Sequence, residues 1–389
     1  MKKIIKTLLA CCCIMVFPFS AIGGEPVKIA FIAPMSGLGM KAHQDVLRAE
    51  RLAVEEINQH GELLGQSLVM IELDDQSTPI GARKAALTAV KENVAAVVGS
   101  SWSSLSLAIA PILQKKGIPM ITFGSTHPDV TRTGDFIFRL CFTDTFQGKV
   151  LAQFARGDLN AQTASVLVNA SSDYSMGLAS VFRKSFIQKN GIILHEKQYR
   201  KETLDFKNIL SDFAPKSKPS EQKPDIIFVP GHSRDSGLIV KQAVVMGIKA
   251  TFMGGDAWQT MTRYPEAVTA AEGAYFSSHW HPGVSNPASL HIKKRFQEKY
   301  GEEIVNYAPV LVYDTIKLLA DAIQCAGSTD RGKIRDAISS TREFPVASGN
   351  ITFDKNGDPV NKEAVILTFK NGRVELVKSW VSNEFQEEP

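Results

Sequence analysis

Cysteine is scarce in this sequence. Only five cysteines occur among 389 residues, and Cys11 to Cys13 fall within the first 23 positions. The rest of the chain keeps Cys141 and Cys325, which are too few for a disulfide scaffold. Cys141 falls in a predicted strand and Cys325 at the end of a predicted helix. We therefore favour two buried free thiols over one disulfide bridge, a choice that the sequence alone leaves open.

Motifs for catalysis and metal binding are also missing. The chain contains no G-x-S-x-G elbow, no G-x-x-x-x-G-K loop and no H-E-x-x-H pair. Gly37 and Gly39 lack the third glycine of a dinucleotide loop. His279 and His281 would give a metal only two protein ligands, where a site needs at least a third. We therefore expect no catalytic residues, no metal, no cofactor and no enzyme activity.

Neither sign of charge dominates. The formal net charge is +4, and it falls to +1 once Lys2, Lys3 and Lys6 are removed with a leader. No dense Lys/Arg face with interleaved aromatic residues is present, so nucleic acid is not an expected partner. Apolar residues make up 44% and charged residues 22% of the chain, a balance typical of globular proteins. The length predicts two domains.

A long apolar run occurs only near the N-terminus. Leu8–Phe19 follows a basic start, and Ala21-Ile22-Gly23 places small residues where a signal peptidase cleaves. We predict a signal peptide over residues 1–23 and a mature protein in the periplasm. A retained anchor is disfavoured, because the run is shorter than the ~18 residues of a membrane span and contains Pro18. Lipidation at Cys11 is disfavoured, because most of the apolar stretch would follow it.

Apolar runs of strand length alternate with helical patterns through most of the chain. Continuous apolar strands separated by helices predict parallel sheets covered on both faces, here as two successive α/β units. Beyond residue 280, three predicted helices precede three predicted strands, with a turn at Asn356-Gly357. The strands predicted before that point are Val27–Pro34, Leu68–Leu73, Ala95–Gly99, Pro119–Phe123, Phe136–Phe142, Ala164–Asn169, Ile193–Tyr199, Asp225–Pro230 and Thr251–Gly254.

Ligands of doubly wound sheets bind beyond the carboxyl ends of the strands, so the residues after each strand are candidates. In the first unit, Ser100–Ser104 places four serines around Trp102 and runs into a helix, where free N–H groups and the dipole favour an anion. Helix capping alone would need a single serine. Gly124, Ser125 and Thr126 follow the next strand and add a carbonyl, hydroxyls and a backbone N–H.

The second unit contributes different chemistry. Tyr174, His232, Asp256 and Trp258 come after its strands. An acid in one unit suits an ammonium group, whereas the neutral donors of the other suit a carboxylate. The aromatic residues suit an apolar or aromatic side chain. Together these residues predict a site for a zwitterion such as an α-amino acid.

The whole chain after the leader resembles the type I periplasmic binding proteins of the leucine/isoleucine/valine-binding family. The opening Ile29-Ala-Phe-Ile-Ala-Pro-Met-Ser-Gly37 is similar to the first strand and loop of that family, and Leu52-Ala-Val-Glu-Glu-Ile-Asn58 to its first helix. Later segments match with the same spacing, namely Ala95–Gly99, Ala110-Pro111, Gly117–Ile121 and Thr126–Thr131.

The resemblance implies roles for several residues. Ser103 falls where the family places a serine on the ligand carboxylate, and Thr126 and Gly124 match further contacts to the two ends of the ligand. Tyr174 matches a wall aromatic of the second lobe, and Asp256 an acid, often Glu, that pairs with the ammonium. Four positions depart from the usual pattern, so the resemblance implies recognition of the amino group but does not predict the side-chain specificity: His232, Trp102, Ala42 and Asp256, whose side chain is shorter than that of Glu.

The resemblance also implies the architecture. It predicts an α/β protein of two doubly wound Rossmann-like lobes joined by a three-strand hinge, with the ligand in the cleft. The first lobe would hold residues 25–144 and 279–350, and the second 145–278 and 351–382.

As a function, the resemblance implies capture of an amino acid by hinge closure and delivery to an ABC transporter permease in the inner membrane, by a monomer. The alternative is a sensor that passes the signal of an amino acid or aromatic acid to a membrane receptor.

Overall fold

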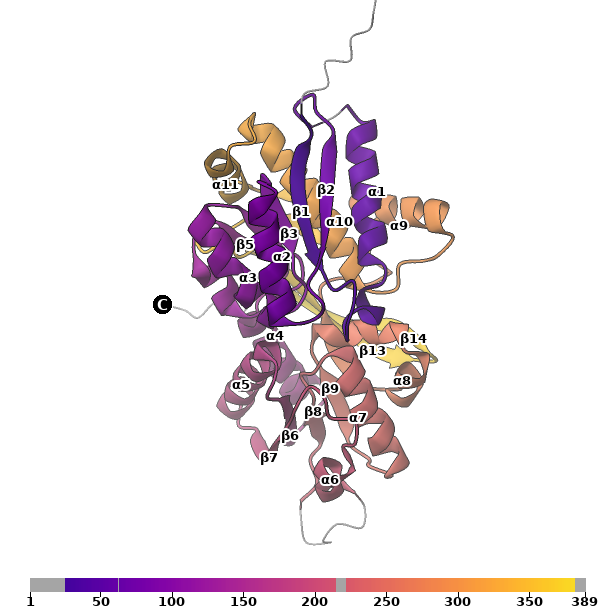
Figure 1. Cartoon of the computed structure of the whole chain (residues 1–389). Helices are drawn as coiled ribbons and strands as arrows, with labels where there is room; N and C mark the ends of the chain where they lie inside the picture. The colour runs from indigo at the N-terminus through magenta and orange to yellow at the C-terminus, as the bar shows by residue number, and fades with distance from the viewer. Residues whose placement is uncertain (1–24, 62, 215–221, 382–389) are drawn as a thin grey trace, which may run out of the picture.

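The computed structural model describes residues 25–61, 63–214 and 222–381 as two lobes, one above the other in Figure 1. The predicted signal peptide, residues 1–23, lies outside the described residues. Within the described ranges, no helix combines the length and the apolar character needed to cross a membrane.

The first lobe is built on a parallel sheet with the strand order β2-β1-β3-β4-β5. Side chains alternate across a strand, so Ile29 and Phe31 pack into one core while Ala30 and Ile32 pack into another on the opposite face. This two-sided burial explains the continuous apolar run of the first strand. The strands are β1 (Val27–Ala33), β2 (Leu68–Asp74), β3 (Ala96–Gly99), β4 (Met120–Thr122) and β5 (Ile137–Arg139).

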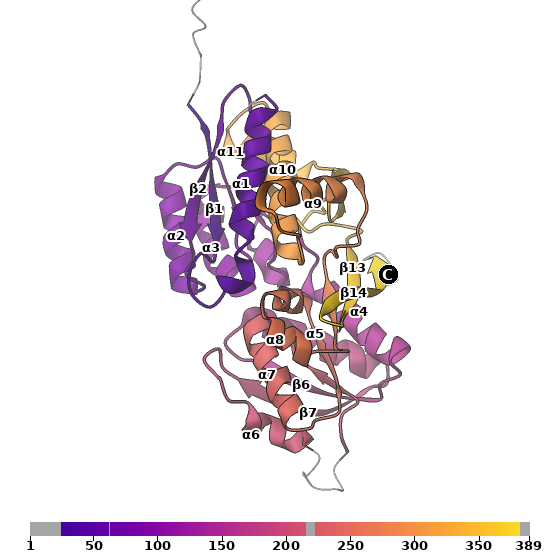
Figure 2. The same cartoon turned by 90° about the vertical axis from the view of Figure 1, so that its right-hand side faces the viewer.

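Helices cover both faces of this sheet. On the face of Phe31 lie α1 (Val46–Gln59) and the long α10 (Tyr307–Ala326), and on the other face lie α2 (Pro79–Lys91) and α3 (Ser103–Lys116). The C-terminal part of the chain returns to this lobe and adds α9 (Pro287–Tyr300), α11 (Arg331–Ser339) and the ribbon of β11 (Phe344–Val346) and β12 (Gly349–Ile351). Figure 2 shows α1 and α10 side by side.

The second lobe has a sheet in the order β14-β13-β10-β9-β8-β6-β7, in which only β13 and β14 run antiparallel to their neighbours. Two cores again lie on opposite faces of it, one with α4 and α5 and one with α7 and α8. The strands are β6 (Thr163–Asn169), β7 (Ile192–Tyr199), β8 (Ile226–Phe228), β9 (Thr251–Gly254), β10 (Tyr275–Ser278), β13 (Glu363–Lys370) and β14 (Arg373–Val381). The helices are α4 (Asp144–Gln153), α5 (Asp173–Gln188), α6 (Lys207–Leu210), α7 (Ser233–Val245) and α8 (Pro265–Ala270).

The chain passes between the lobes three times. Cys141 packs in the core of the first lobe and Phe142 in that of the second, so the first passage falls between them. The second falls at His279, between β10 and Trp280 of the first-lobe core. The third follows Phe353, which also packs in the first lobe. Residues 351–353 therefore lie with the first lobe, although the sequence analysis assigned 351–382 to the second.

Two smaller predictions concern the turn at Asn356-Gly357 and the cysteines. The turn is present, with the Gly357 N–H donating to the carbonyl of Asp354 and a positive φ of 79° at Gly357. Cys141 and Cys325 are both free thiols, as predicted. The prediction that both are buried is wrong for Cys325, which lies exposed near the end of α10.

Candidate functional site

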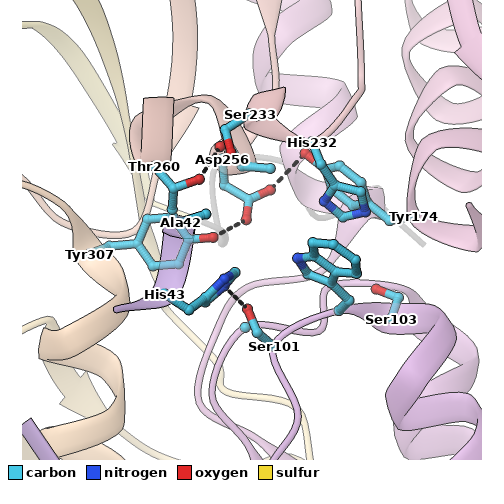
Figure 3. A pocket seen from close by; sticks show the side chains of 13 residues that line it. Ala42, His43, Ser101, Ser103, Tyr174, His232, Ser233, Asp256, Thr260 and Tyr307 are labelled. Atoms are coloured by element: carbon cyan, nitrogen blue, oxygen red, sulfur yellow. Dashed lines mark hydrogen bonds between the residues drawn. The ribbon is translucent and has the colours of Figure 1, made fainter. Parts of the chain in front are cut away.

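A cavity of about 350 Å³ lies between the two lobes, and residues of both line it (Figure 3). Loops at the carboxyl ends of the strands supply most of the lining, as expected for doubly wound sheets. The lining residues are Ala42, His43, Ser101, Trp102, Ser103, Gly124, Tyr174, His232, Ser233, Asp256, Ala257, Thr260 and Tyr307.

Asp256 is the acidic residue of this lining. It follows β9 and is 2% exposed. The Tyr174 hydroxyl donates to its Oδ1 at 3.0 Å, the Tyr307 hydroxyl to its Oδ2 at 3.1 Å and His279 Nε2 to the same oxygen at 3.3 Å. An ionised carboxylate has about four acceptor positions, so these donors leave capacity for a ligand. Burial opposes its charge, but these hydrogen bonds outweigh burial and lower the pKa of Asp256.

A second buried acid, Asp144, lies next to this site, and its pKa is shifted in the opposite direction from that of Asp256. Gln147 links the two, because its Nε2 donates to Asp144 Oδ1 at 3.0 Å and its Oε1 accepts the Asp256 N–H at 2.7 Å. Burial and the neighbouring charge of Asp256 raise the pKa of Asp144 to about 8. At neutral pH the pair therefore carries one negative charge, and Asp256 bears it.

The opposite wall of the cavity presents hydrogen-bond donors. Ser103 is the first residue of α3, a helix of 14 residues whose N-terminus carries free N–H groups and a favourable dipole for an anion. The Ser103 Oγ accepts the His127 N–H at 3.2 Å, so its own O–H remains available to donate. A carboxylate placed here would receive charge-assisted hydrogen bonds.

Ser101 has a different role because of His43. The Nδ1 of His43 lies 3.0 Å from the carbonyl of Gly39 and must carry the proton, since a carbonyl cannot donate. The Nε2 of His43 is then an acceptor, and the Ser101 hydroxyl donates to it at 2.6 Å. Ser101 therefore presents only oxygen lone pairs to the cavity. Figure 3 shows this pair below Asp256.

Aromatic rings form the side of the cavity. His232 stacks on Trp102 with ring centroids 4.2 Å apart and on Tyr174 with centroids 5.4 Å apart. Trp102 belongs to the first lobe and the other two rings to the second, so the stack spans the gap between the lobes.

Six of the nine predicted site residues line the cavity, namely Trp102, Ser103, Gly124, Tyr174, His232 and Asp256. Ser125, Thr126 and Trp258 do not. Ser125 turns away and hydrogen-bonds Ser106 Oγ at 2.7 Å, while Thr126 is fully buried and accepts the Asp144 N–H at 2.8 Å with its carbonyl.

The placement of Trp258 in the cavity wall is wrong. Its ring is fully buried in a core of the second lobe, and its Nε1 donates to the carbonyl of Val229 at 2.9 Å. Asp256–Arg263 forms a 3-10 helix, in which residues two apart point in different directions. The turn that directs Asp256 into the cavity therefore sends Trp258 into the core.

The sequence analysis missed two residues that shape the site. Tyr307 opens α10 behind the Asn306 cap and comes from the C-terminal return to the first lobe, far from any strand end. His43 lies in the loop between β1 and α1. His43 could have been found from the sequence, since its neighbour Ala42 was compared with the family pattern.

The buried His43 makes the stability of the protein depend on pH. Burial lowers the pKa of His43 from 6.5 to about 4, although the hydrogen bond to Gly39 opposes this shift. A group whose pKa is lower in the folded state stabilises the fold above the unfolded pKa and loses that contribution as pH falls. We expect about 3 kcal/mol of the free energy of unfolding to disappear between pH 6.5 and pH 4 through this residue.

Urea unfolding of the His43→Gln variant checks this expectation. Since glutamine does not titrate, the free energy of unfolding of the variant should fall less steeply than that of the wild type as pH drops from 7 to 4.5. His60→Gln is the control, because His60 lies exposed at the end of α1. Parallel pH profiles for His43→Gln and the wild type would contradict a neutral, buried His43.

Comparisons with known proteins identify the family of this chain. A family model described as periplasmic binding protein matches residues 26–373. The Leu/Ile/Val-binding protein BraC3 of Rhizobium johnstonii is 24% identical over 384 residues, which cover 96% of this chain and 98% of that protein.

Solved structures show the same relationship. The leucine-binding protein LivK of Thermotoga maritima is 35% identical with a TM-score of 0.85, covering 92% of this chain and 100% of that one. The branched-chain amino acid transporter substrate-binding protein LivJ of Streptococcus pneumoniae, solved with isoleucine, is 29% identical with a TM-score of 0.83, covering 92% and 99%. These relatives are binding proteins and not enzymes. The chain therefore belongs to the type I periplasmic binding proteins, in the family of the leucine/isoleucine/valine-binding proteins.

Proposed function

We propose that this protein captures an α-amino acid between its lobes and delivers it to the permease of an ABC transporter. One observation carries the proposal: the free O–H of Ser103 and the N-terminus of α3 face the ionised Asp256 across a single small cavity. A zwitterion has the matching charges at the matching ends. With both cavity histidines held neutral by burial, which lowers the pKa of His43 to about 4 and of His232 to about 3, an ammonium group at Asp256 meets no cationic side chain of the lining.

The relatives support this class of ligand. The protein from Thermotoga maritima is named as a leucine-binding protein, and the structure from Streptococcus pneumoniae contains isoleucine. In this chain the rings of Trp102, Tyr174 and His232 form the wall of the cavity. We therefore propose an amino acid with an apolar or aromatic side chain.

Contacts across the gap support closure of the lobes around the ligand. The Asp173 N–H donates to Ser104 Oγ at 3.1 Å, and Arg263 of the second lobe forms an ion pair with Asp45 of the first. Each contact joins one lobe to the other, so rotation of the lobes away from each other would break it. Three connecting segments are a suitable hinge for such a motion, and a ligand held by both lobes would favour the closed form.

The cellular setting follows from the leader and the family. Periplasmic binding proteins work outside the inner membrane, and residues 1–23 have the pattern of a secretory signal. We propose that the mature protein acts in the periplasm as a monomer, with a transporter permease as its partner.

Calorimetric titration with a panel of amino acids tests the proposal. We expect one amino acid to bind per chain, and Ser103→Ala to weaken it about tenfold or more, because a hydrogen bond to a charged group is worth ~1.5–3 kcal/mol. Ser185→Ala is the control, since Ser185 is a buried serine on α5 that does not line the cavity. Binding of uncharged sugars alone, or equal affinities of Ser103→Ala and the wild type, would refute the proposal.

A further inference from the structure

A second cavity adjoins the amino acid site on the outer side of the aromatic stack. It measures about 670 Å³, and Trp102, His232 and Ser233 line both cavities. The stack of Trp102 on His232, with ring centroids 4.2 Å apart, forms the partition between them. Both lobes contribute to this outer chamber, so it also depends on how the lobes are arranged.

The outer chamber combines an apolar wall with two cations. Leu38, Pro79 and Leu105 of the first lobe line it together with the Trp102 ring. Lys201 and Arg234 of the second lobe supply the positive charge. Neither cation forms a salt bridge with any residue that the structure describes. Both side chains are half-buried, and an anion that entered the cavity would meet two cations without an ion-pair partner to displace.

Lys201 is held in place without a salt bridge to any described residue. Its Nζ donates to the carbonyl of Ser77 in the first lobe at 2.7 Å and lies 5.6 Å from the centre of the Trp102 ring. An ammonium group has three donors, so two remain for a ligand. Burial is the main cause that lowers the pKa of Lys201, and the charges of Glu202 and Asp75 oppose this shift.

Asp235, the acidic residue that lines the chamber, already accepts two hydrogen bonds from other side chains. Asp235 Oδ2 accepts the Tyr199 hydroxyl at 2.5 Å and Asn169 Nδ2 at 3.1 Å. Burial raises the pKa of Asp235, while its hydrogen bonds with Tyr199 and Asn169 oppose that shift, and no salt bridge joins it to either cation.

We propose that the outer chamber is a second binding site, which takes an organic carboxylate on an apolar stem. The carboxylate would lie between Lys201 and Arg234, and the stem against Leu38, Pro79 and Leu105. The anion could belong to a separate molecule or to the far end of a long amino acid whose head group occupies the inner cavity. Either source places the carboxylate on the second lobe and the apolar stem on the first, and a ligand held by both lobes favours their closed arrangement.

Titration calorimetry with hexanoate tests this site, with hexanamide as its uncharged analogue. We expect hexanoate to bind and hexanamide to bind at least about tenfold more weakly, because the amide cannot form the charge-assisted hydrogen bonds. The Lys201→Met, Arg234→Met double variant should lose this preference. Lys249→Met is the control, since Lys249 is exposed and lies outside both cavities.

The Asp256→Ala variant separates this proposal from that of the amino acid site. We expect it to lose amino acid binding and to keep hexanoate binding, so the outer site can be demonstrated even if no amino acid binds. Hexanoate binding that is lost in Asp256→Ala but kept in the double variant would place hexanoate in the inner cavity and overturn the proposal. Absence of hexanoate binding to the wild type would overturn it as well.

A further titration identifies the source of the anion. 2-Aminosuberate, an amino acid with a distal carboxylate, should compete with hexanoate if a single ligand spans both cavities. If the two sites take separate molecules, leucine and hexanoate should bind together, with two ligands per chain. Either result supports the second site if the Lys201→Met, Arg234→Met double variant also loses the preference for the carboxylate in that titration.

Discussion

Replacing Asp256 by alanine should weaken amino acid binding by roughly 30-fold to several thousand-fold, since loss of one partner of a buried charge pair costs ~2–5 kcal/mol. Asp256 is buried and ionised, and it would lie against the ligand ammonium with no other acid of the lining to replace it. The same substitution should change the affinity for a plain carboxylic acid of equal size much less, because that ligand has no ammonium group. Calorimetric titration of both ligands measures the difference.

Asp144→Asn is the matched control for this experiment. Asp144 is as deeply buried as Asp256 and is connected to it through Gln147. Its raised pKa, about 8, means that the carboxyl is neutral at pH 7, so asparagine preserves the charge of the site. We therefore expect Asp144→Asn to keep amino acid binding near the wild-type level. Equal losses for the amino acid and the carboxylic acid in Asp256→Ala would count against an ammonium contact.

Replacing Arg139 by methionine should lower the free energy of unfolding by about 3–5 kcal/mol, the typical cost of breaking a buried ion pair from one side. Arg139 is fully buried in the first lobe. Its guanidinium contacts Asp358 at 2.5 Å and donates to the carbonyls of Ser125 at 2.7 Å and His127 at 2.9 Å. Methionine would leave these acceptors without their donor. Urea unfolding measures the change.

Arg132→Met is the control for the stability measurement. Arg132 forms an ion pair with Asp129 at 3.1 Å, but both side chains are more than half exposed. Exposed pairs contribute little, so we expect a change below about 1 kcal/mol. A comparable loss of unfolding free energy in the two variants would show that the buried contacts of Arg139 stabilise the fold no more than an exposed ion pair does. The Arg139 variant should also bind amino acids more weakly, because the network positions the loop of Gly124 and the segment of Asp358 together.

The fold was accessible to sequence analysis because its strands are buried on both faces. A strand such as β1 then becomes a run of apolar residues without alternation, and the helices between such runs determine a parallel sheet. The third passage between the lobes was harder to place. Ile351 and Phe353 are apolar and belong to short extended segments, so nothing in their sequence distinguishes packing on the first lobe from packing on the second.

The candidate site was accessible where it follows strand ends. Ser103 and Asp256 each come within a few residues of the end of a strand, and the topology brings them to the same cavity. Trp258 was misplaced because its direction depends on the tight turn after Asp256, which its residue type does not reveal. Tyr307 was missed because the chain returns to the first lobe after more than a hundred residues in the second, and only the tertiary structure brings its hydroxyl to Asp256.

The stack between Trp102 and His232 also provides an optical signal. Trp258 and Trp280 are fully buried, each inside one lobe, whereas the Trp102 ring contacts a ring of the other lobe. When the lobes part, Trp102 loses this neighbour and meets water, while the two core indoles keep their surroundings. The intrinsic fluorescence of Trp102 should therefore report opening and closing in unlabelled protein, and a Trp102→Phe variant would identify its share of the emission.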